Sequence, residues 1–326
     1  MHKINWGIIG CGNVTEVKSG PAFNKVPGSS LVAVMRRDEE LVKDYAKRHG
    51  VPRWYTDANE LINDPDVDAI YVATPPSSHE QYTLAAIKTG KPVYVEKPMS
   101  VDAASAARMA KAAEQAAVKL SVAHYRREQP LFRKVKELID SKIVGDIRFA
   151  RIELCKKLLT DDELKVHKNS WRVDAAISGG GIFHDLAPHQ LDLMYYFFGK
   201  PVKSSGIATN QSKAYAADDI VTGAILFDSG VIFEGIWCFT VAPSDEKDIC
   251  IITGEKGKIY FSIFENQGIA VVINNVTETY NFDSLQHVQQ SMIEAVTNYF
   301  LGKGSNPCPA DEGVAIMELI DSFTQK

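Results

Sequence analysis

Three polar residues between positions 184 and 192 have the types and the spacing that proton transfer requires. Asp185 stands four residues before His189, and Asp192 stands three residues after it. If a helix begins near residue 184, the three side chains share one face, because successive residues turn by about 100°. An Asp on the same face can orient an imidazole and stabilise its protonated form. His189 is therefore a candidate acid or base, with Asp185 as its partner.

Two other interpretations of this stretch stay open. The same His and Asp side chains could form internal caps and hydrogen bonds, since buried polar groups are costly unless they pair. A metal site is the weakest interpretation, because no further His or Cys stands at ligand spacing. Pro188 would fall in or just after the first turn of such a helix, where proline is least costly.

A lysine follows directly on a short apolar run. The run Val93 to Glu96 predicts a strand, and Lys97 then stands at its carboxyl end, the edge where open α/β sheets bind ligands. An alcohol carbon that gives up a hydride must also lose its hydroxyl proton. A lysine can accept or polarise that proton when nearby cations or desolvation lower its pKa. Taken alone, a lysine at such a place is more often only a surface charge.

The first predicted strand, Ile4 to Ile9, leads straight into a glycine turn with the sequence Gly10-Cys11-Gly12-Asn13-Val14-Thr15. This is the context of the dinucleotide-binding fingerprint. Gly10 allows the tight turn, and Gly12 lets the backbone approach a pyrophosphate at the start of a helix. Thr15 occupies the third position, where Gly or Ala would permit the closest packing. The alternative is a glycine turn that binds nothing.

The residues at the end of the second predicted strand indicate which of two dinucleotides, NAD or NADP, the protein prefers. It reads Met35-Arg36-Arg37-Asp38. Proteins specific for NAD usually place an acidic residue here for the ribose 2′-hydroxyl, whereas an arginine accommodates the 2′-phosphate of NADP. Arg36 and Arg37 therefore favour NADP over NAD. The alternative is that both arginines lie on a solvated loop and that Asp38 only caps the next helix.

Short apolar runs alternate with helical stretches over residues 1–123, which predicts an α/β domain with a doubly wound parallel sheet. Residues 124–326 predict an α+β domain built on a large, mostly antiparallel open sheet, with turns at Asp228-Ser229-Gly230 and Glu255-Lys256-Gly257. The predicted strands of the first domain are Ile4 to Ile9, Leu31 to Met35, Ala69 to Ala73, Val93 to Glu96 and Leu120 to Ala123. The predicted helices are Glu39 to His49, His79 to Thr89, Asp102 to Ala117, Leu131 to Ser141, one from near Asp185, Gln286 to Leu301 and Asp311 to Phe323.

Composition narrows the class of protein. A chain of 326 residues with 45% hydrophobic and 24% charged residues is long enough for two globular domains. The net charge of −5 favours neither nucleic acid nor an anionic membrane as a partner. The five cysteines form no C-x-x-C pair, and no apolar run approaches the length of a membrane span. We expect a cytoplasmic protein without a metal.

Several ordered motifs together carry a resemblance to a known family. They are Gly10-Cys11-Gly12, Ala73-Thr74-Pro75-Pro76-Ser77-Ser78-His79, Gly90-Lys91-Pro92-Val93 running into Glu96-Lys97-Pro98, Trp171-Arg172, and Gly179-Gly180-Gly181 leading to Asp185 and His189. Across essentially the whole chain, the sequence resembles the family of glucose-fructose oxidoreductase, inositol dehydrogenase and rhizopine-catabolism proteins (Gfo/Idh/MocA). The resemblance implies a Rossmann domain followed by a second domain that binds substrate and forms oligomers.

The resemblance also implies roles for individual residues. Thr74, Pro75 and His79 would line the nicotinamide side of the cofactor cleft. Asn13 and Val14, in the glycine turn that cradles the pyrophosphate, would also bind the cofactor. Glu96 and Lys97 would reach the nicotinamide and substrate, next to a cis peptide bond before Pro98. Trp171 and Arg172 would approach the cofactor from the second domain. His189 would act as acid or base, with Asp185 as its partner or as a substrate ligand.

The function that follows is an NAD(P)-dependent oxidoreductase that moves a hydride between the nicotinamide and a carbinol or carbonyl carbon of a sugar, polyol or related substrate. Lys97 and His189 would handle the proton, with exchangeable roles, and side chains such as Tyr125 and Arg126 would contact the substrate. A dihydrodiol-type dehydrogenase is one alternative. The other is a non-catalytic dinucleotide sensor of the same fold, which would not need Lys97, Asp185 and His189 together. Family members commonly form dimers or tetramers through the second-domain sheet, so we expect a homodimer or homotetramer.

Overall fold

The computed structural model describes residues 2–265 and 268–325. The chain forms two compact units. The first comprises Met1–Gln129 and Leu285–Met317, and the second comprises Pro130–Ser284 and Glu318–Lys326. Our division after residue 123 therefore leaves out the return of a C-terminal segment to the first unit. Aromatic packing holds that segment on the first unit, because the ring of Phe300 stacks on the ring of Trp6 with centroids 5.4 Å apart.

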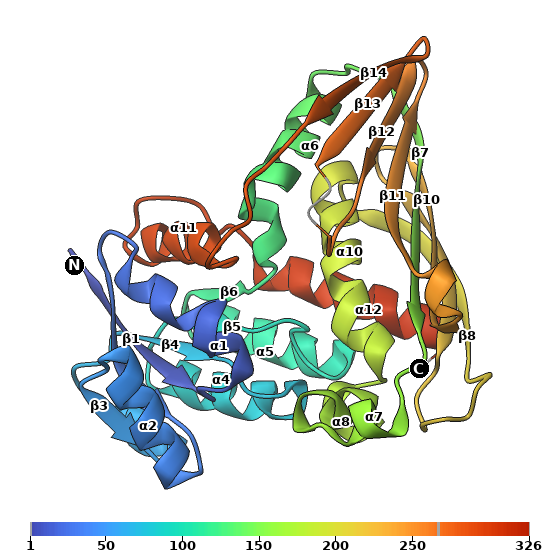
Figure 1. Ribbon diagram of the computed structural model, residues 1–326. Helices are drawn as coiled ribbons and strands as arrows, with labels where there is room; N and C mark the ends of the chain where they lie inside the picture. The colour runs from blue at the N-terminus through green and yellow to red at the C-terminus, as the bar shows by residue number, and fades with distance from the viewer. Residues whose placement is uncertain (1, 266–267, 326) are drawn as a thin grey trace. The chain divides into compact units, whose positions relative to one another are not determined.

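The first unit is built on a parallel sheet, as predicted (Figure 1). Among the described residues its strand order is β3-β2-β1-β4-β5-β6, which is the doubly wound order. The strands are β1 Ile4–Ile9, β2 Ser29–Met35, β3 Arg53–Tyr55, β4 Ala69–Val72, β5 Val93–Val95 and β6 Leu120–Val122. The helices are α1 Asn13–Val17, α2 Glu39–His49, α3 Ala58–Asn63, α4 His79–Lys88, α5 Ala103–Gln115 and α11 Gln290–Phe300, with 3-10 turns at η1 Gly20–Asn24, η2 Pro76–Ser78 and η3 Tyr125–Glu128.

The central strands are apolar because both faces of a parallel sheet are covered. All four residues of β4 and all three of β5 are buried. Aromatic rings fill the space beside them: Tyr71 stacks on Tyr94 with centroids 5.1 Å apart, and Phe23 packs 5.3 Å from Tyr71. This packing fixes the carboxyl ends of the strands. It therefore also fixes where the loops that follow β1, β4 and β5 begin.

The second unit is built on a larger sheet, with strand order β14-β13-β12-β11-β7-β10-β9-β8 among the described residues. Neighbouring strands are antiparallel except for β7 and β10, so the predicted mostly antiparallel sheet is confirmed. The strands are β7 Ile147–Lys157, β8 Pro201–Thr209, β9 Ile220–Phe227, β10 Ile232–Val241, β11 Lys247–Gly254, β12 Gly257–Phe261, β13 Ile269–Ile273 and β14 Val276–Tyr280. The helices are α6 Pro130–Asp140, α7 Asp161–Lys165, α8 His167–Val173, α9 Ala175–Ser178 and α10 Ile182–Phe198, with a 3-10 turn η4 at Pro243–Asp245. Helix α12, Ala310–Thr324, belongs to the first unit up to Met317 and to the second from Glu318.

One face of this sheet is covered by α10 and by the end of α12 (Figure 1). Gly206 pairs with Gly223, and Gly223 pairs with Gly235, so three glycines form a row across β8, β9 and β10. A Cβ at Gly223 would lie 2.3 Å from the ring of Phe323, and one at Gly206 would lie 2.6 Å from the Cα of the same residue. The glycines are therefore needed so that the end of α12 can lie directly on the sheet.

Helix α10 differs in one respect from the predicted helix. It begins at Ile182, two residues before the predicted start, because Gly181 ends the preceding turn with φ of +92°. Pro188 consequently lies inside the helix rather than in its first turn. A proline there removes one backbone hydrogen bond of the helix. The helix is confirmed, but Pro188 lies deeper in it than the first turn, where we expected it and where proline is least costly.

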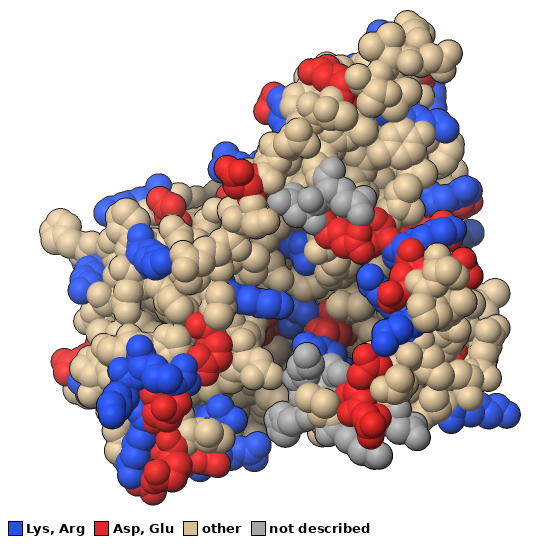
Figure 2. All heavy atoms as spheres, viewed as in Figure 1, with Lys and Arg blue, Asp and Glu red and all other residues tan. Residues whose placement is uncertain are grey.

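Acidic and basic side chains are intermixed on the face shown in Figure 2, including the surface of α2. On that helix Lys43 pairs with Glu39 at 2.8 Å, and Arg48 pairs with Asp44 at 2.6 Å. Such exposed pairs stabilise a helix only slightly. Within residues 2–265 and 268–325, no helix is long and apolar enough to cross a membrane.

Candidate active site

The glycine turn after β1 is tightly built at its first glycine. Gly10 has φ of +92°, and a Cβ there would lie 2.7 Å from Cγ2 and 2.8 Å from the backbone nitrogen of Thr74. The backbone nitrogen of Gly10 donates to the carbonyl of Met35 at 2.9 Å. A side chain at position 10 is thus excluded twice, by the backbone conformation and by the loop after β4. The turn draws the ends of β1, β2 and β4 together.

The second glycine of the turn, Gly12, is not required by the backbone conformation or by packing within the protein. Gly12 has φ of −124°, which any residue adopts, and a Cβ there would meet nothing closer than the carbonyl oxygen of Gly10 at 3.9 Å. Neither backbone strain nor protein packing requires a glycine at this position. The space above it fits the close approach of a dinucleotide pyrophosphate to the backbone.

Thr15, which stands at the third fingerprint position in place of Gly or Ala, fits inside the first unit. Thr15 is fully buried, and its hydroxyl donates to the carbonyl of Gly12 at 2.8 Å. The carbonyl of Thr15 in turn accepts a hydrogen bond from the hydroxyl of Tyr45 at 2.9 Å. A threonine therefore fits here because both of its polar groups have partners.

Arg36 and Arg37 lie differently. The guanidinium of Arg36 donates to the carbonyl of Cys11 at 3.3 Å, which brings it beside the glycine loop. Arg37 is exposed. Asp38 caps α2 by accepting a hydrogen bond from the backbone of Leu41 at 3.0 Å, as the structural alternative supposed. Arg36 is thus placed near the loop, and Asp38 is engaged in the helix cap.

His79 lies between the ends of β4 and β5. It is fully buried, with Nδ1 3.0 Å from the carbonyl oxygen of Pro98 and Nε2 2.7 Å from that of Thr74. Burial lowers the pKa of His79, against the raising effect of these carbonyls. The imidazole is therefore engaged with two loops of the protein, while Pro75 beside it is exposed.

The peptide bond between Lys97 and Pro98 is cis, as the resemblance implies. Glu96 is 5% exposed, and its carboxylate accepts hydrogen bonds from the Tyr71 hydroxyl at 2.5 Å, from the Gln289 amide at 2.6 Å and from the backbone nitrogen of Lys97 at 3.1 Å. These contacts place Glu96 inside the unit, with its carboxylate engaged by the protein. Lys97 is half-buried at the end of β5.

Three further residues of the first unit follow β6. Burial lowers the pKa of His124 well below its usual value, and the nearby positive charges of Arg127 and Lys97 lower it further. His124 is therefore a neutral imidazole close to Lys97 at pH 7. Tyr125 is 5% exposed, and the guanidinium of Arg126 lies 5.7 Å from its ring. The predicted substrate contacts Tyr125 and Arg126 thus follow His124 directly and lie in the same unit as Lys97.

In the second unit, Asp185, His189 and Asp192 lie on α10 at the spacing that puts them on one face, and they are 8%, 5% and 1% exposed. The ring of Phe264 packs edge-on against His189, with centroids 5.8 Å apart. The helix and the burial of its polar face are as predicted. The meeting of His189 with Lys97, which lies in the other unit, stays a prediction.

Asp185 has a partner that the sequence interpretation did not foresee. The Nε atom of Arg172 lies 2.6 Å from its carboxylate, and the guanidinium of Arg172 also lies 4.9 Å from the ring of Trp171. Arg172 was predicted as a cofactor contact and Asp185 as the partner of His189. The structure links the two motifs Trp171-Arg172 and Asp185-x-x-x-His189 through this ion pair.

Sequence reasoning missed Tyr71 and Gln289. Both contact Glu96, yet neither belongs to a recognisable motif, and Gln289 is 193 residues away from Glu96 along the chain. The predicted helix from Gln286 begins only at Gln290, so Gln289 lies in the preceding loop. No periodicity of the sequence could have placed that loop beside β5.

Two family models match the chain. Residues 4–124 match the oxidoreductase family with an NAD-binding Rossmann fold, and residues 132–260 match the GFO/IDH/MocA C-terminal domain. The chain belongs to the GFO/IDH/MocA family of oxidoreductases. It is similar to Oxidoreductase P35 of Formosa agariphila, with 47% identity over 98% of each chain. It is also 30% identical to a 1,5-anhydro-D-fructose reductase of Ensifer adhaerens, over 72% of this chain and 69% of the relative.

The solved structures agree on the fold. An aldose-aldose oxidoreductase from Caulobacter crescentus, complexed with glycerol, superposes with a TM-score of 0.85 at 23% identity and covers 98% of this chain and 96% of its own. The family assignment accounts for the parallel sheet with its glycine loop and for the large sheet of the second unit. The protein is thus an NAD(P)-binding oxidoreductase of this family, with a Rossmann unit as predicted.

Proposed function

We propose that this oxidoreductase transfers a hydride between a nicotinamide dinucleotide and the carbinol or carbonyl carbon of a sugar, polyol or related small substrate. The observation that carries the proposal is the open space at Gly12 on the same sheet edge that bears Lys97. A dinucleotide bound over the glycine turn follows that edge toward the end of β5. The named reductase from Ensifer adhaerens, which matches most of the chain, supports a sugar-like substrate.

The bound dinucleotide supplies or accepts the hydride. The chain itself must handle the proton of the substrate hydroxyl, and it offers an amine and an imidazole for this task. In this proposal Lys97 polarises the substrate oxygen and His189 takes or returns the proton, or the two groups exchange these roles. Arg172 holds the Asp185 carboxylate at 2.6 Å, and so fixes an acceptor on the same helix face as His189.

For the dinucleotide we propose NADP over NAD. Arg36 lies beside the glycine loop through its hydrogen bond to Cys11, and no acidic side chain follows β2 before Asp38, which caps α2. A guanidinium at this place suits a 2′-phosphate. Calorimetric titration with NADP and NAD tests the choice: wild type should prefer NADP, and Arg36→Ala should lose about tenfold in NADP affinity with little effect on NAD. Equal affinities in the wild type would overturn it.

Turnover is tested with a panel of sugars, polyols, keto-sugars and a dihydrodiol, monitored by absorbance of the reduced nicotinamide. Lys97→Ala should remove at least about 10²-fold of kcat on any substrate found, because an acid-base group contributes that much. Lys97→Arg keeps the charge and serves as the matched variant. Activity that survives both changes would remove Lys97 from the mechanism. Tight cofactor binding with no turnover on any compound would favour a dinucleotide sensor.

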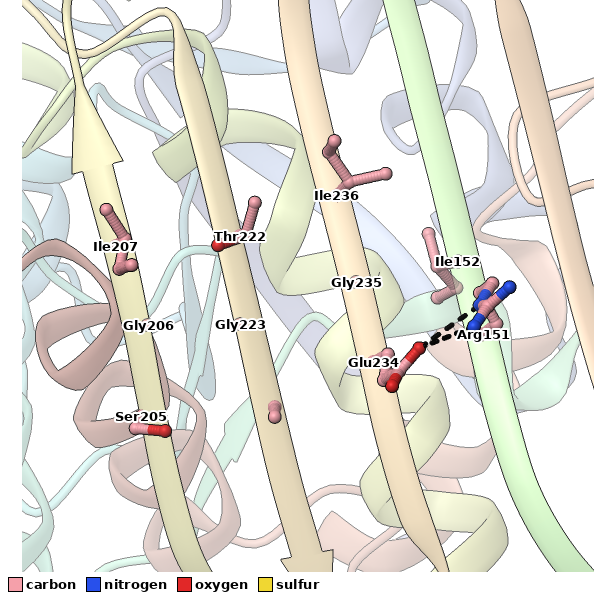
Figure 3. A pocket seen from close by; sticks show the side chains of 11 residues that line it. Arg151, Ile152, Ser205, Gly206, Ile207, Thr222, Gly223, Glu234, Gly235 and Ile236 are labelled. Atoms are coloured by element: carbon pink, nitrogen blue, oxygen red, sulfur yellow. Dashed lines mark hydrogen bonds and ion pairs between the residues drawn. The ribbon is translucent and has the colours of Figure 1, made fainter.

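We also propose that a second copy of the chain covers the face of the second-unit sheet that α10 leaves exposed. Arg151 and Glu234 pair there at 2.7 Å beside a hollow of about 470 Å³ over the glycine row (Figure 3). Exposed apolar side chains share this face, and apolar side chains gathered on one exposed face are typical of an interface. They are Phe149, Ile207, Leu226, Ile232 and Ile236.

A symmetric pair of identical faces would bury these apolar residues against each other. Sedimentation of the wild type should give a dimer or tetramer, and Ile207→Glu together with Ile236→Glu should give monomers. Leu41→Glu on α2 is the control, since Leu41 is also exposed but belongs to the first unit. A wild type that sediments as a monomer at all concentrations would overturn this part of the proposal.

A further inference from the structure

The carboxylate of Glu96 is held on both of its oxygens by groups of the first unit. Oε1 accepts from the Tyr71 hydroxyl and from the Gln289 amide, and Oε2 accepts from the backbone nitrogen of Lys97. Glu96 is 5% exposed. A buried carboxylate with three donors is well satisfied. Its geometry suits an anchor of the protein better than a ligand of substrate.

The donors are themselves fixed. Burial and the adjacent Glu96 raise the pKa of Tyr71 well above its usual value, so its hydroxyl keeps the proton that it donates. Tyr71 also stacks on Tyr94 at 5.1 Å. The amide oxygen of Gln289 lies 3.5 Å from each of the two tyrosine hydroxyls, which leaves its NH₂ group directed at Glu96. This assignment of the amide follows from the hydrogen bonds around it.

The loop that carries Gln289 is also tied to the helix after the glycine turn. The backbone nitrogen of Gln289 donates to the carbonyl of Lys18 at 3.2 Å, and Nδ1 of His287 lies 2.6 Å from the carbonyl of Val17. On its other side, the amide of Gln129 donates to the carbonyl of Val288 at 3.0 Å. One short loop therefore connects the end of α1 with the carboxylate that holds the backbone of Lys97.

We propose that Tyr71 and Gln289 are positioning residues, which act through Glu96 to fix the backbone of Lys97 and to couple it to the glycine loop. This inference rests on the proposed function in one respect, namely that Lys97 does the chemistry. The contacts themselves belong to the first unit and do not depend on the substrate. The contact of Glu96 with the nicotinamide that the resemblance implies stays a prediction, and the proposal concerns only the hydrogen bonds that join its carboxylate to Tyr71, Gln289 and the backbone of Lys97.

The first test measures the chemical reactivity of the Lys97 amine, without any substrate. Lysines are labelled by reductive methylation over a range of pH, and the rate at Lys97 is followed by peptide mass spectrometry. Gln289→Leu removes the hydrogen bonds of the amide to Glu96, Tyr71 and Tyr94 and keeps a side chain of similar size. It should change the labelling rate of Lys97 by about threefold or more and shift the pH profile, because a freed backbone no longer holds the amine in one place. Thr297→Val, in the helix α11 that follows Gln289 and also buried, is the control and should leave both the labelling rate and its pH profile unchanged.

A reciprocal exchange gives the sharper test. In Glu96→Gln with Gln289→Glu, the pair can still join an amide to a carboxylate, and the Tyr71 hydroxyl lies near both positions. The double variant should recover most of the wild-type labelling profile, whereas each single change should not. If Gln289→Leu fails to fold, Tyr71→Phe removes one donor and keeps the ring stacking.

Turnover then separates this inference from the proposed function. On an active substrate, Gln289→Leu should lower kcat about tenfold with less than about twofold change in KM, as expected when a catalytic group is displaced while substrate binding is preserved. A Lys97 labelling profile that is identical in wild type, Gln289→Leu and Tyr71→Phe would overturn the positioning role. A changed profile in a protein that turns over nothing would leave the positioning role standing and defeat the proposed catalysis.

Discussion

Two acidic residues of the motifs, Glu96 in the first unit and Asp185 in the second, are held in opposite ways. Glu96 is bound by neutral donors in a buried aromatic core. Asp185 is bound by the guanidinium of Arg172, whose side chain is 35% exposed. A buried carboxylate with neutral donors is a fixed part of the fold, because its loss leaves several donors without acceptors. A carboxylate paired with a solvated cation can change partners when a ligand binds.

The largest effect that tests this contrast is on stability. Glu96→Ala should lower the free energy of unfolding by about 3 kcal/mol, since it leaves the Tyr71 hydroxyl and the Gln289 amide buried without their acceptor. Asp185→Ala should lower it by about 1 kcal/mol or less, because water can replace the lost partner of Arg172. Urea denaturation followed by circular dichroism gives both values.

Glu96→Gln is the matched control for the first change, since it keeps an acceptor oxygen and nearly the same volume. It should recover part of the loss. Equal destabilisation by Glu96→Ala and Asp185→Ala would contradict the distinction between a carboxylate that is fixed in the fold and one that can change partners when a ligand binds.

The same contrast shows what the sequence could and could not predict. Helix α2 was predicted with its observed ends, Glu39 and His49, because its signals are local: Asp38 caps the start and Gly50 ends it with φ of +65°. The polar face of α10 was predicted from spacing alone. The partners of Glu96 and Asp185 were not, because a contact across 193 or 13 residues depends on the packing of whole elements.

The short elements were missed for a related reason. Strand β3 has three residues, Arg53–Tyr55, and helices α7 to α9 have four to seven, which is too few for a periodic pattern to emerge. The return of residues 285–317 to the first unit was missed because its predicted helix looks like any other amphipathic helix. Its place is set by long-range contacts, among them those with the ring of Trp6, the carboxylate of Glu96 and the carbonyls at the end of α1.

A smaller effect should separate the two carboxylates by function. Arg172→Ala should cost less stability than Glu96→Ala, because water can reach the partly exposed site of the guanidinium, and should lower kcat/KM about tenfold, because Asp185 loses the group that fixes its direction. Arg172→Lys keeps a positive charge but lacks the planar donor fork of the guanidinium, so it should recover part of the activity. Steady-state kinetics at two salt concentrations provide the measurement. A stability loss as large as that of Glu96→Ala would make the ion pair structural and contradict the contrast.

The smallest predicted effect is a loss of stability of the folded protein as the pH falls. His124 has a pKa lowered well below its usual 6.5 by burial and by the charges of Arg127 and Lys97, whereas the unfolded chain titrates near 6.5. Below that pH the unfolded state binds a proton that the folded state does not, so stability is full above about pH 7.5 and falls as the pH drops through the unfolded value. Between pH 7.5 and 6.0 this histidine alone should cost about 0.8 kcal/mol. Urea denaturation at both pH values should show that loss in the wild type and a smaller one in His124→Gln, whose side chain does not titrate. An undiminished loss in His124→Gln would mean that the proton is taken up elsewhere, and that the neutral imidazole near Lys97 is not what makes the first unit sensitive to acid.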